Sequence, residues 1–368
     1  MKLLFFSTSL AGGGAERVLA NLSSALSKLG HEVIVSINED RRFYSIDEKV
    51  KIIVAPQRRW YSGNNPLFRL IRRVLRNFRD SRHTRNVITT TKPDIIVSFL
   101  QCNMSAIIRW HKGIPIINSE HNAYDRKLGL KNYYHRFVLN RFFDKVCVLS
   151  TFDIGYASAK MLKNVIYIPN PNTYDSISDV EYNKLFPNRK NILICGRLDA
   201  WYVKGFDIAI KVFGKIANIH PSLYLDIVGG GSDDSIEILN KIASKYGVKD
   251  RVRFLGQCAN MSELYRTHQI FLLTSRTEGF PMVVSEAMSQ GLPCISFERL
   301  SSHIIIDGRD GILIPNRDEN EMLQALLYIL TNDTVRYNYG LEGVHNIGRF
   351  SPDRVAQMWI KLFNSVVE

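Results

Sequence analysis

The chain lacks the features that mark several large classes of protein. Its 368 residues include only five scattered cysteines with no CxxC pair, which excludes a disulfide framework and indicates a reducing compartment. No run of about 18 uncharged apolar residues occurs, so the sequence predicts no membrane-spanning helix. The apolar run at residues 3–6 is too short for a signal peptide, and no small-residue cleavage site follows it. A composition of 45% apolar and 23% charged residues excludes disorder.

Two common phosphate-binding signatures are also missing. The turn after the first predicted strand, AGGGAER at residues 11–17, fits neither GxGxxG nor GxxxxGK[ST], which disfavours a dinucleotide fold and a P-loop. Its glycines still permit close backbone approach, and the helix that follows offers free N–H groups to an anion. Gly13 and Gly14 are therefore candidate anion contacts. The alternative is a tight turn that binds nothing.

Short apolar segments of strand-like composition alternate with helical periodicity along the chain. Continuous apolar strands separated by helices predict parallel sheets covered on both faces. The strands form two series, and the segment 169–179, rich in Pro, Asn, Asp and Ser, resembles a linker between them. The sequence therefore predicts an α/β fold of two facing, doubly wound, Rossmann-like domains with a central cleft at the C-terminal ends of both sheets. The expected domains are residues 1–170 and 171–350, with a C-terminal helix at 351–368 that packs back on the first domain.

Two segments of the second half carry residues suited to a phosphorylated sugar. Arg197 leaves the end of a predicted strand and Lys204 begins the next helix, so the two cations can converge on a diphosphate. Glu278 lies in a loop after another strand, and Glu286 follows eight residues later in a helix. Carboxylates accept hydrogen bonds from sugar hydroxyls, and backbone N–H groups at the helix start can face an anion. Solvated surface charges are the alternative for each residue taken alone. The candidate backbone contacts are Gly279, Phe280, Pro281, Met282 and Val283, and of these only the proline has no N–H to donate.

Taken in order, these segments resemble the retaining GT-B glycosyltransferases of family 4. The resemblance rests on GGGAERVL, GRL with a downstream KG, DIVGGGSD, RVRFLGQ, the E-x7-E block from Glu278 to Glu286, and DGRDGILI. Each piece is weak, but the ordered set at these separations is specific. The chain departs from the family pattern at Arg299–His303, where members often have a glycine-rich turn and a glutamate.

The resemblance implies transfer of a sugar from a nucleotide-sugar with retention of its anomeric configuration. The second domain would bind the donor, with Glu286 on the ribose and Glu278 and the 279–283 backbone on the sugar. Arg197 and Lys204 would neutralise the diphosphate, and Gly13 and Gly14 would close on it from the first domain, which binds the acceptor. The resemblance assigns no nucleophile. No Asp-x-Asp signature is present, so we expect neither a metal nor a cofactor.

A histidine in the first domain also matches the family pattern. His121 stands in Ser119-Glu120-His121-Asn122, directly after a predicted buried strand. In the family a histidine at this strand end lies near the reacting sugar, so the resemblance makes His121 a catalytic candidate beside Glu278. The alternative is a loop histidine whose ring is satisfied within the protein.

The excess of positive over negative charge lies entirely in the first half of the chain. Residues 1–180 carry 27 Lys+Arg against 14 Asp+Glu, whereas residues 181–368 carry 21 of each, and the net charge is +13. A one-sided excess argues for an anionic partner. Ten of the cations lie within residues 57–92, beside Trp60 and Tyr61. A helix there would place Arg69, Arg72, Arg73, Arg76 and Arg79 largely opposite an apolar face of Leu67, Leu70, Ile71, Val74, Leu75 and Phe78.

A basic amphipathic helix suits an anionic membrane surface. The alternative is an ordinary domain helix that buries its apolar side, although one helix can do both. With the family resemblance, the first half suggests a cytoplasmic enzyme, peripheral on the inner face of the cytoplasmic membrane. It would add a hexose or N-acetylhexosamine to a polyprenyl-diphosphate-linked glycan for a surface polysaccharide such as O-antigen. The expected nucleotide of the donor is UDP first and GDP second.

Two further readings stay open. The basic half could serve a nucleic-acid- or anion-binding protein, but aromatic residues do not recur along it as a stacking platform, so no nucleic acid is expected. A chain of the same architecture could instead be a non-catalytic sugar-nucleotide binder, a phosphorylase or an epimerase.

Overall fold

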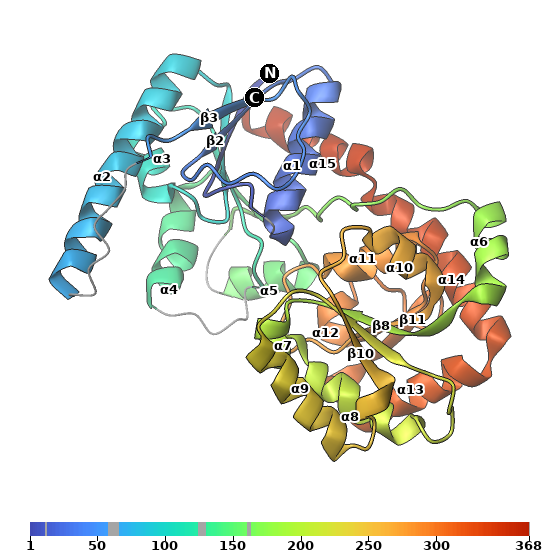
Figure 1. Ribbon diagram of the computed structural model, residues 1–368. Coiled ribbons are helices and arrows are strands. Elements are labelled where there is room, and N and C mark those ends of the chain that lie inside the picture. Colours follow the sequence, from blue (N-terminus) through green and yellow to red (C-terminus); the bar gives the residue numbers. More distant parts are fainter. Residues whose placement is uncertain (12, 58–65, 124–129, 160–162, 368) are drawn as a thin grey trace. The chain divides into compact units, whose positions relative to one another are not determined.

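The chain divides into two compact units, each built on one parallel sheet (Figure 1). The computed structural model describes residues 1–11, 13–57, 66–123, 130–159 and 163–367, with the backbone alone described at 66–70, 72, 131, 158 and 159. Unit 1 comprises Met1–Thr173 and Pro352–Glu368, and unit 2 comprises Tyr174–Ser351. The first crossing between the units thus falls within the predicted linker. Each unit is described below by itself.

Unit 1 contains a seven-stranded sheet in the order β3-β2-β1-β4-β5-β6-β7. All of its neighbouring strands pair in parallel, and the order reverses direction between β1 and β4. Such a reversal is the point at which doubly wound sheets bind ligands. The strands are β1 (Lys2–Ser7), β2 (Glu32–Ile37), β3 (Lys51–Val54), β4 (Ile95–Phe99), β5 (Ile116–Ser119), β6 (Lys145–Val148) and β7 (Val165–Tyr167).

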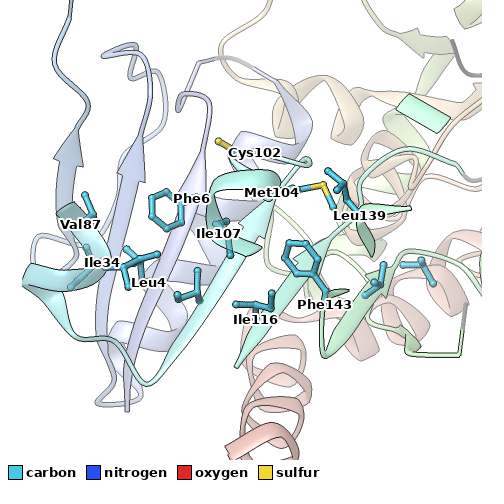
Figure 2. Close-up of a cluster of buried hydrophobic side chains, with 14 of the residues drawn as sticks. Leu4, Phe6, Ile34, Val87, Cys102, Met104, Ile107, Ile116, Leu139 and Phe143 are labelled. Atoms are coloured by element: carbon cyan, nitrogen blue, oxygen red, sulfur yellow. The ribbon is translucent and has the colours of Figure 1, made fainter. Parts of the chain in front are cut away.

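Helices cover both faces of this sheet. One buried cluster joins Leu4, Ile96 and Ile116 of the strands to side chains from α2, α3, α4 and α5, so these helices share a face (Figure 2). Helix α15, at the end of the chain, packs against α1 in the same unit (Figure 1). The helices are α1 (Gly14–Lys28), α2 (Pro66–Thr91), α3 (Met104–Trp110), α4 (Leu130–Phe137), α5 (Thr151–Ala159) and α15 (Pro352–Val367), with a 3-10 turn η1 at Leu139–Phe142.

Unit 2 contains a six-stranded parallel sheet in the order β10-β9-β8-β11-β12-β13. Its order reverses between β8 and β11. Helices α8, α9 and α13 pack together on one side of the sheet, and α10, α11 and α14 on the other (Figure 1). The strands are β8 (Lys190–Cys195), β9 (Leu225–Val228), β10 (Val252–Gly256), β11 (His268–Leu273), β12 (Cys294–Phe297) and β13 (Gly311–Ile314).

The helices of unit 2 include two that are a single turn long, α7 (Trp201–Lys204) and α12 (Glu298–Ser301). The longer ones are α6 (Asp179–Leu185), α8 (Phe206–Ile216), α9 (Asp233–Lys245), α10 (Met261–Thr267), α11 (Met282–Ser289), α13 (Glu319–Thr331) and α14 (Asp333–Ile347). Short 3-10 turns are η2 (Phe186–Asn188), η3 (Leu198–Ala200), η4 (Lys249–Arg251), η5 (Pro315–Arg317) and η6 (Gly348–Phe350).

The predicted fold class, two doubly wound α/β sheets, is confirmed. Strands form in two series along the apolar runs. The inner strands such as β1, β4, β9 and β12 are buried on both faces, so they need no polar alternation and stand out in the sequence. Among the described residues, no helix is long and apolar enough to cross a membrane.

The sequence leaves helix α2 between two alternatives, an amphipathic helix for a membrane surface and an ordinary helix that buries its apolar side. Its C-terminal half does so, since Val87 and Ile88 belong to the core cluster of unit 1. In its N-terminal half, however, the described apolar side chains face solvent, with exposed fractions between 44 and 69%. These are Ile71, Val74, Leu75 and Phe78. Inward packing is therefore wrong for this half, which presents an uncovered apolar stripe.

A charged network stabilises the sheet of unit 2. Asp226 on β9 is buried and accepts hydrogen bonds from Arg253 Nε and Nη2, both at 2.6 Å, while His268 Nε2 lies 2.9 Å from Asp226 Oδ2. Burial alone would raise the pKa of the Asp226 carboxyl, but the bonds to His268 and Arg253 outweigh burial and lower that pKa. A lowered folded-state pKa contributes stability above the unfolded pKa, which is lost as pH falls through the folded value.

We expect Asp226→Asn to lower the free energy of unfolding at pH 7 by about 2–3 kcal/mol, because hydrogen bonds to an ionised group are lost. The wild type should lose stability more steeply than the variant below about pH 4, where only the wild type has this carboxylate to protonate. Urea titrations at pH 7 and pH 3.5 measure both effects. Asp250→Asn, at an exposed position on η4, is the control. Parallel pH profiles for wild type and Asp226→Asn would contradict the assignment.

Candidate active site

The candidate site of unit 2 lies at the C-terminal edge of its sheet, where the strand order reverses. Neighbouring strands β8 and β11 end at Cys195 and Leu273, and the chain leaves them in opposite directions to β9 and β12. Loops that leave adjacent strands in opposite directions open a crevice at the sheet edge. The loop after β8 carries Arg197 and Lys204, and the loop after β11 carries Glu278.

The structure brings Lys204 and Glu278 together. Lys204 Nζ donates to Glu278 Oε1 at 2.8 Å, and Ser275 Oγ donates to the same oxygen at 2.7 Å. The two charged side chains are 26% and 14% exposed, so the pair is reachable from solvent while its geometry is held by the protein. A cation and a carboxylate are thus fixed within one hydrogen bond of each other. Ser275 was not predicted, and it contributes a second donor that fixes the carboxylate.

A glycine makes this meeting possible. Gly205, directly after Lys204, adopts a φ of +67°, and an added Cβ would lie 1.8 Å from the backbone oxygen of Thr274. Thr274 Oγ1 in turn donates to the Gly205 carbonyl at 2.7 Å. Only a residue without a side chain lets the end of α7 approach the end of β11 this closely.

The loop that carries Glu278 is anchored to α7 and α8. Arg276 makes a two-pronged ion pair with Asp207, with both N···O distances at 2.8 Å, and its guanidinium stacks 3.8 Å from the ring centroid of Tyr202. The backbone N–H of Arg276 donates to the Val203 carbonyl at 2.7 Å. These partners were not predictable from the sequence, because a lone Asp and a lone Arg some 70 positions apart form no motif.

Arg197 is the exposed residue that precedes η3 at its N-cap position. The turn that bears it is fixed by Asp199, whose Oδ1 accepts from Ser232 N, Ser232 Oγ and Ser235 Oγ, each at 2.9 Å. These bonds lower the pKa of the Asp199 carboxyl. They join the β8 loop to the start of α9 and so hold the Arg197 backbone at the sheet edge. Within the described residues, the Arg197 side chain makes no hydrogen bond or ion pair with Lys204 or Glu278, which pair with each other.

The segment 279–283 leads from Glu278 into α11. Phe280 is buried, with its ring 5.6 Å from that of Phe350, and Pro281 occupies the N-cap position of the helix. The N–H of Met282 donates to the Phe280 carbonyl at 2.9 Å, so this expected anion donor already has an internal partner. Gly279 and Val283 are partly exposed beside it.

Glu286 lies in the second turn of α11 and is buried, 3% exposed. Its Oε2 accepts a hydrogen bond from Tyr265 Oη of α10 at 3.0 Å. A surface position on the helix is therefore excluded for Glu286. Tyr265, three residues before β11, was missed because no pattern in the sequence distinguishes it from a core tyrosine.

In unit 1, His121 follows β5, and its ring packs on Phe99 with centroids 4.4 Å apart. Ser119 Oγ lies 3.0 Å from its Nε2, and within the described ranges its Nδ1 has no hydrogen-bond partner. Burial lowers the pKa of His121 to about 3, so the imidazole is neutral near pH 7. A neutral ring can donate from one nitrogen and accept at the other.

A buried ion pair positions the backbone around His121. Glu120 and Arg136 are each 1% exposed, and Arg136 Nη2 lies 3.4 Å from Glu120 Oε2. Arg136 also donates to the carbonyls of Ala123 and Asn122, at 2.9 and 3.2 Å, and so ties α4 to the residues after His121. The side chains of Gln101, Asn118 and Asn140 donate to the Glu120 carboxylate.

Three remaining expectations concern backbone turns and metals. Gly13 is the N-cap residue of α1, and Gly14 is the first residue of the helix and is exposed. That these two glycines contact an anion stays a prediction. The divergent segment Arg299–His303 forms α12 and the turn after it. There burial, with a smaller contribution from Arg349, lowers the pKa of His303 to about 4. In the part of the chain that the structure describes, no three His, Cys, Asp or Glu side chains group as metal ligands.

We expect Gly205→Ala to destabilise the protein by at least about 2 kcal/mol, because a left-handed backbone and a clash with Thr274 coincide there. Gly247→Ala is a matched control, since Gly247 has a φ of +69° but nothing within 4 Å of an added Cβ. Melting temperatures of the two variants separate backbone strain, common to both, from the close approach specific to Gly205. Equal losses would show that the approach of α7 to β11 is not constrained.

The chain is similar to known proteins over its whole length. Residues 12–171 match Glycosyltransferase Family 4, and residues 189–332 match Glycosyl transferases group 1. An amylovoran biosynthesis glycosyltransferase of Erwinia amylovora is 27% identical over 96% of both chains. A Campylobacter jejuni transferase, named as adding α-1,4-N-acetyl-D-galactosamine to a diNAcBac-PP-undecaprenol-linked glycan, is 27% identical over 100% of this chain and 99% of that one.

Solved structures support the same fold. The UDP-bound crystal structure of HepE from Anabaena superposes with a TM-score of 0.75 at 18% identity, covering 99% of this chain and all of that one. The E-x7-E block and the glycine-rich turn of this chain lie within the matched domains. The chain therefore belongs to the glycosyltransferases, with a family 4 domain followed by a group 1 domain on GT-B-type sheets.

Proposed function

We propose that this glycosyltransferase moves a hexose or N-acetylhexosamine from a nucleotide-sugar, UDP-linked in the first instance, to a polyprenyl-diphosphate-linked glycan. The observation that carries the proposal is the meeting of Lys204 and Glu278 at the sheet edge, 2.8 Å apart. A sugar diphosphate needs a cation for its phosphates and an acceptor for its sugar hydroxyls side by side. The Lys204–Glu278 pair supplies both from residues that also match the family motif.

The roles follow from the chemistry of each group. Lys204 neutralises the diphosphate as a point charge, and Arg197, on the other arm of the β8 loop, adds a planar fork. Glu278 accepts hydrogen bonds from sugar hydroxyls, with Ser275 and Lys204 fixing its carboxylate. On binding, the Lys204 ammonium can contact both Glu278 and a phosphate oxygen, because an ammonium has three protons to donate. Glu286 accepts from the ribose hydroxyls.

The reaction breaks the bond between the anomeric carbon and the phosphate oxygen and forms one from that carbon to the acceptor oxygen. In the retaining course both oxygens lie on the same face of the sugar, and the acceptor proton passes to the departing phosphate. Negative charge develops on that phosphate in the transition state. Lys204 and Arg197 stabilise the charge, which makes their contribution electrostatic and lowers the barrier. In unit 1, Gly13, Gly14 and His121 keep the roles predicted for them.

Two similarities support the donor and the acceptor. HepE binds UDP on a sheet architecture like this one, and the Campylobacter enzyme acts on an undecaprenol-linked glycan. The acceptor of the chain would then be anchored in a bilayer, so the enzyme must work at a membrane surface. Surface polysaccharide synthesis at the cytoplasmic face of the cytoplasmic membrane is the setting that we infer.

Helix α2 supports this setting. Its uncovered apolar stripe, Ile71 to Phe78, lies on a helix whose Arg73 and Arg76 are exposed, while Arg79 pairs with Asp80 at 2.6 Å. Only the backbone of Arg69 and Arg72 is described, and Trp60 and Tyr61 lie outside the described residues. An exposed apolar stripe flanked by cations is the arrangement that inserts into an anionic interface. The phosphates of a nucleic acid would pair with the cations, but a nucleic-acid partner would not account for the exposed apolar stripe.

We expect UDP to raise the melting temperature of the wild type more than GDP or ADP does, because binding to the folded state stabilises it. The rise should vanish in Glu286→Ala and in the double variant Arg197→Ala and Lys204→Ala. Glu263→Ala, on the exposed surface of α10, is the control. EDTA should leave both the rise and sugar transfer unchanged, since two side-chain cations serve the phosphates.

Transfer itself is assayed with UDP-sugars and an undecaprenyl-diphosphate-linked acceptor. The anomeric configuration of the product, read by NMR, should match that of the donor. An inverted product would overturn the retaining course, and full turnover by Glu286→Ala would overturn the site. A rise in melting temperature with GDP alone would show that the donor is a GDP-sugar and not a UDP-sugar.

We expect the protein to sediment with phosphatidylglycerol vesicles and not with phosphatidylcholine vesicles at low salt. The pair Arg73→Gln and Arg76→Gln should weaken binding by about ten-fold or more, at about 1 kcal/mol per cation near the surface. The pair Val74→Ser and Phe78→Ser should weaken it as well, by removing inserted apolar area. Arg41→Gln with Arg42→Gln, exposed on the same unit, is the charge-matched control. Tight oligonucleotide binding without vesicle binding would instead favour a nucleic-acid partner.

A further inference from the structure

A largely buried cluster lies beside Glu286 in unit 2. Tyr265 on α10 has no exposed surface, and its hydroxyl reaches Glu286 Oε2 at 3.0 Å. The Tyr265 ring packs edge-on against Phe271 of β11, with centroids 6.0 Å apart, and 6.4 Å from the ring of Tyr174. The thiol of Cys195, the last residue of β8, lies close enough to Tyr265 for a side-chain hydrogen bond. All four residues belong to unit 2.

The hydroxyl of Tyr265 acts as a hydrogen-bond donor to Glu286. Burial, and next the negative charge of Glu286, raise the pKa of the Tyr265 phenol well above its ordinary value of 10. A phenol that stays protonated has one proton to give, and here a carboxylate oxygen receives it. The Tyr265 ring is completely buried and packs against Phe271 and Tyr174, which restricts its movement. The Glu286 carboxylate therefore accepts its hydrogen bond from a group held by packing.

We propose that Tyr265 is a positioning residue for Glu286 and thereby sets the affinity of the site for the ribose hydroxyls of the donor nucleotide. The proposal rests on the ribose role of Glu286 given under the proposed function. A carboxylate with three rotatable bonds loses rotamer entropy when it clasps a diol. Tyr265 removes that cost beforehand by holding the side chain in one orientation, which is preorganisation in its simplest form.

The inference gives a distinct kinetic signature. The ribose lies far along the donor from the bond that breaks, so its contacts are the same in the ground state and the transition state. Loss of such uniform binding raises KM and leaves kcat unchanged. A hydrogen bond to an ionised group corresponds to about ten-fold in affinity or more. Tyr265→Phe keeps the ring and removes only the hydroxyl, so we expect KM for the donor to rise about ten-fold at unchanged kcat.

The decisive experiment compares UDP with 2′,3′-dideoxy-UDP by isothermal titration in the wild type, Tyr265→Phe, Glu286→Ala and Tyr337→Phe. The ratio of the two dissociation constants within one preparation reports the ribose contact and does not depend on the fraction of folded protein. Tyr337→Phe is the matched control, because its hydroxyl also donates to a side chain, Asn183 Oδ1 at 2.6 Å. We expect a ratio of about ten or more in the wild type and the control. It should fall toward one in the other two variants.

The outcomes separate the inference from the function on which it rests. A ratio near one in the wild type would show that the ribose hydroxyls are not recognised, which overturns the role of Glu286 itself. A ratio that falls in Glu286→Ala but persists in Tyr265→Phe would leave that role intact and overturn the inference about Tyr265. A drop in kcat at constant KM in Tyr265→Phe would also overturn it, since a uniform binding contact cannot act on kcat alone.

Discussion

The site of unit 2 depends on one topological constraint, the reversal of strand order between β8 and β11. Because these strands are neighbours and send their chains to opposite sides, residues 74 positions apart, Lys204 and Glu278, can meet at one sheet edge. The two side chains orient each other through a hydrogen bond of 2.8 Å. In the proposed function, a diphosphate-sugar adds charge-assisted bonds to this arrangement.

The surroundings of that pair restrict its movement from three directions. Gly205 admits the carbonyl of Thr274, Ser275 holds the Glu278 carboxylate, and the Arg276–Asp207 pair holds the loop between them. Unit 1 solves a similar problem differently. There the charged groups, Glu120 and Arg136, are buried behind the loop, and the residue they help to place, His121, is neutral. The charged pair at the unit 2 site is thus itself reachable from solvent, whereas the one beside His121 serves only to position its neighbours.

The sequence sufficed for the sheets and for the ion pair's members, but not for what holds them. Strands buried on both faces are long apolar runs, and Glu278 follows such a run, so both were predictable. Tyr265, Ser275 and Asp207 act through single long-range contacts that leave no periodic trace. The sequence predicts the apolar face of α2 but leaves its exposure between two alternatives, because periodicity gives the angle of a stripe and not what covers it.

The uneven charge of the chain follows from the difference between local and long-range recognition. Residues 181–368 are neutral overall, although this half holds the cations for which we propose a diphosphate. A few oriented groups suffice once a ligand is in contact. A lipid surface offers no single contact point and attracts by its summed potential over about a Debye length. The excess of 13 positive charges lies in residues 1–180, the half that carries the uncovered stripe of α2. Net charge and apolar exposure therefore occur together in the half for which we propose a lipid surface as the partner.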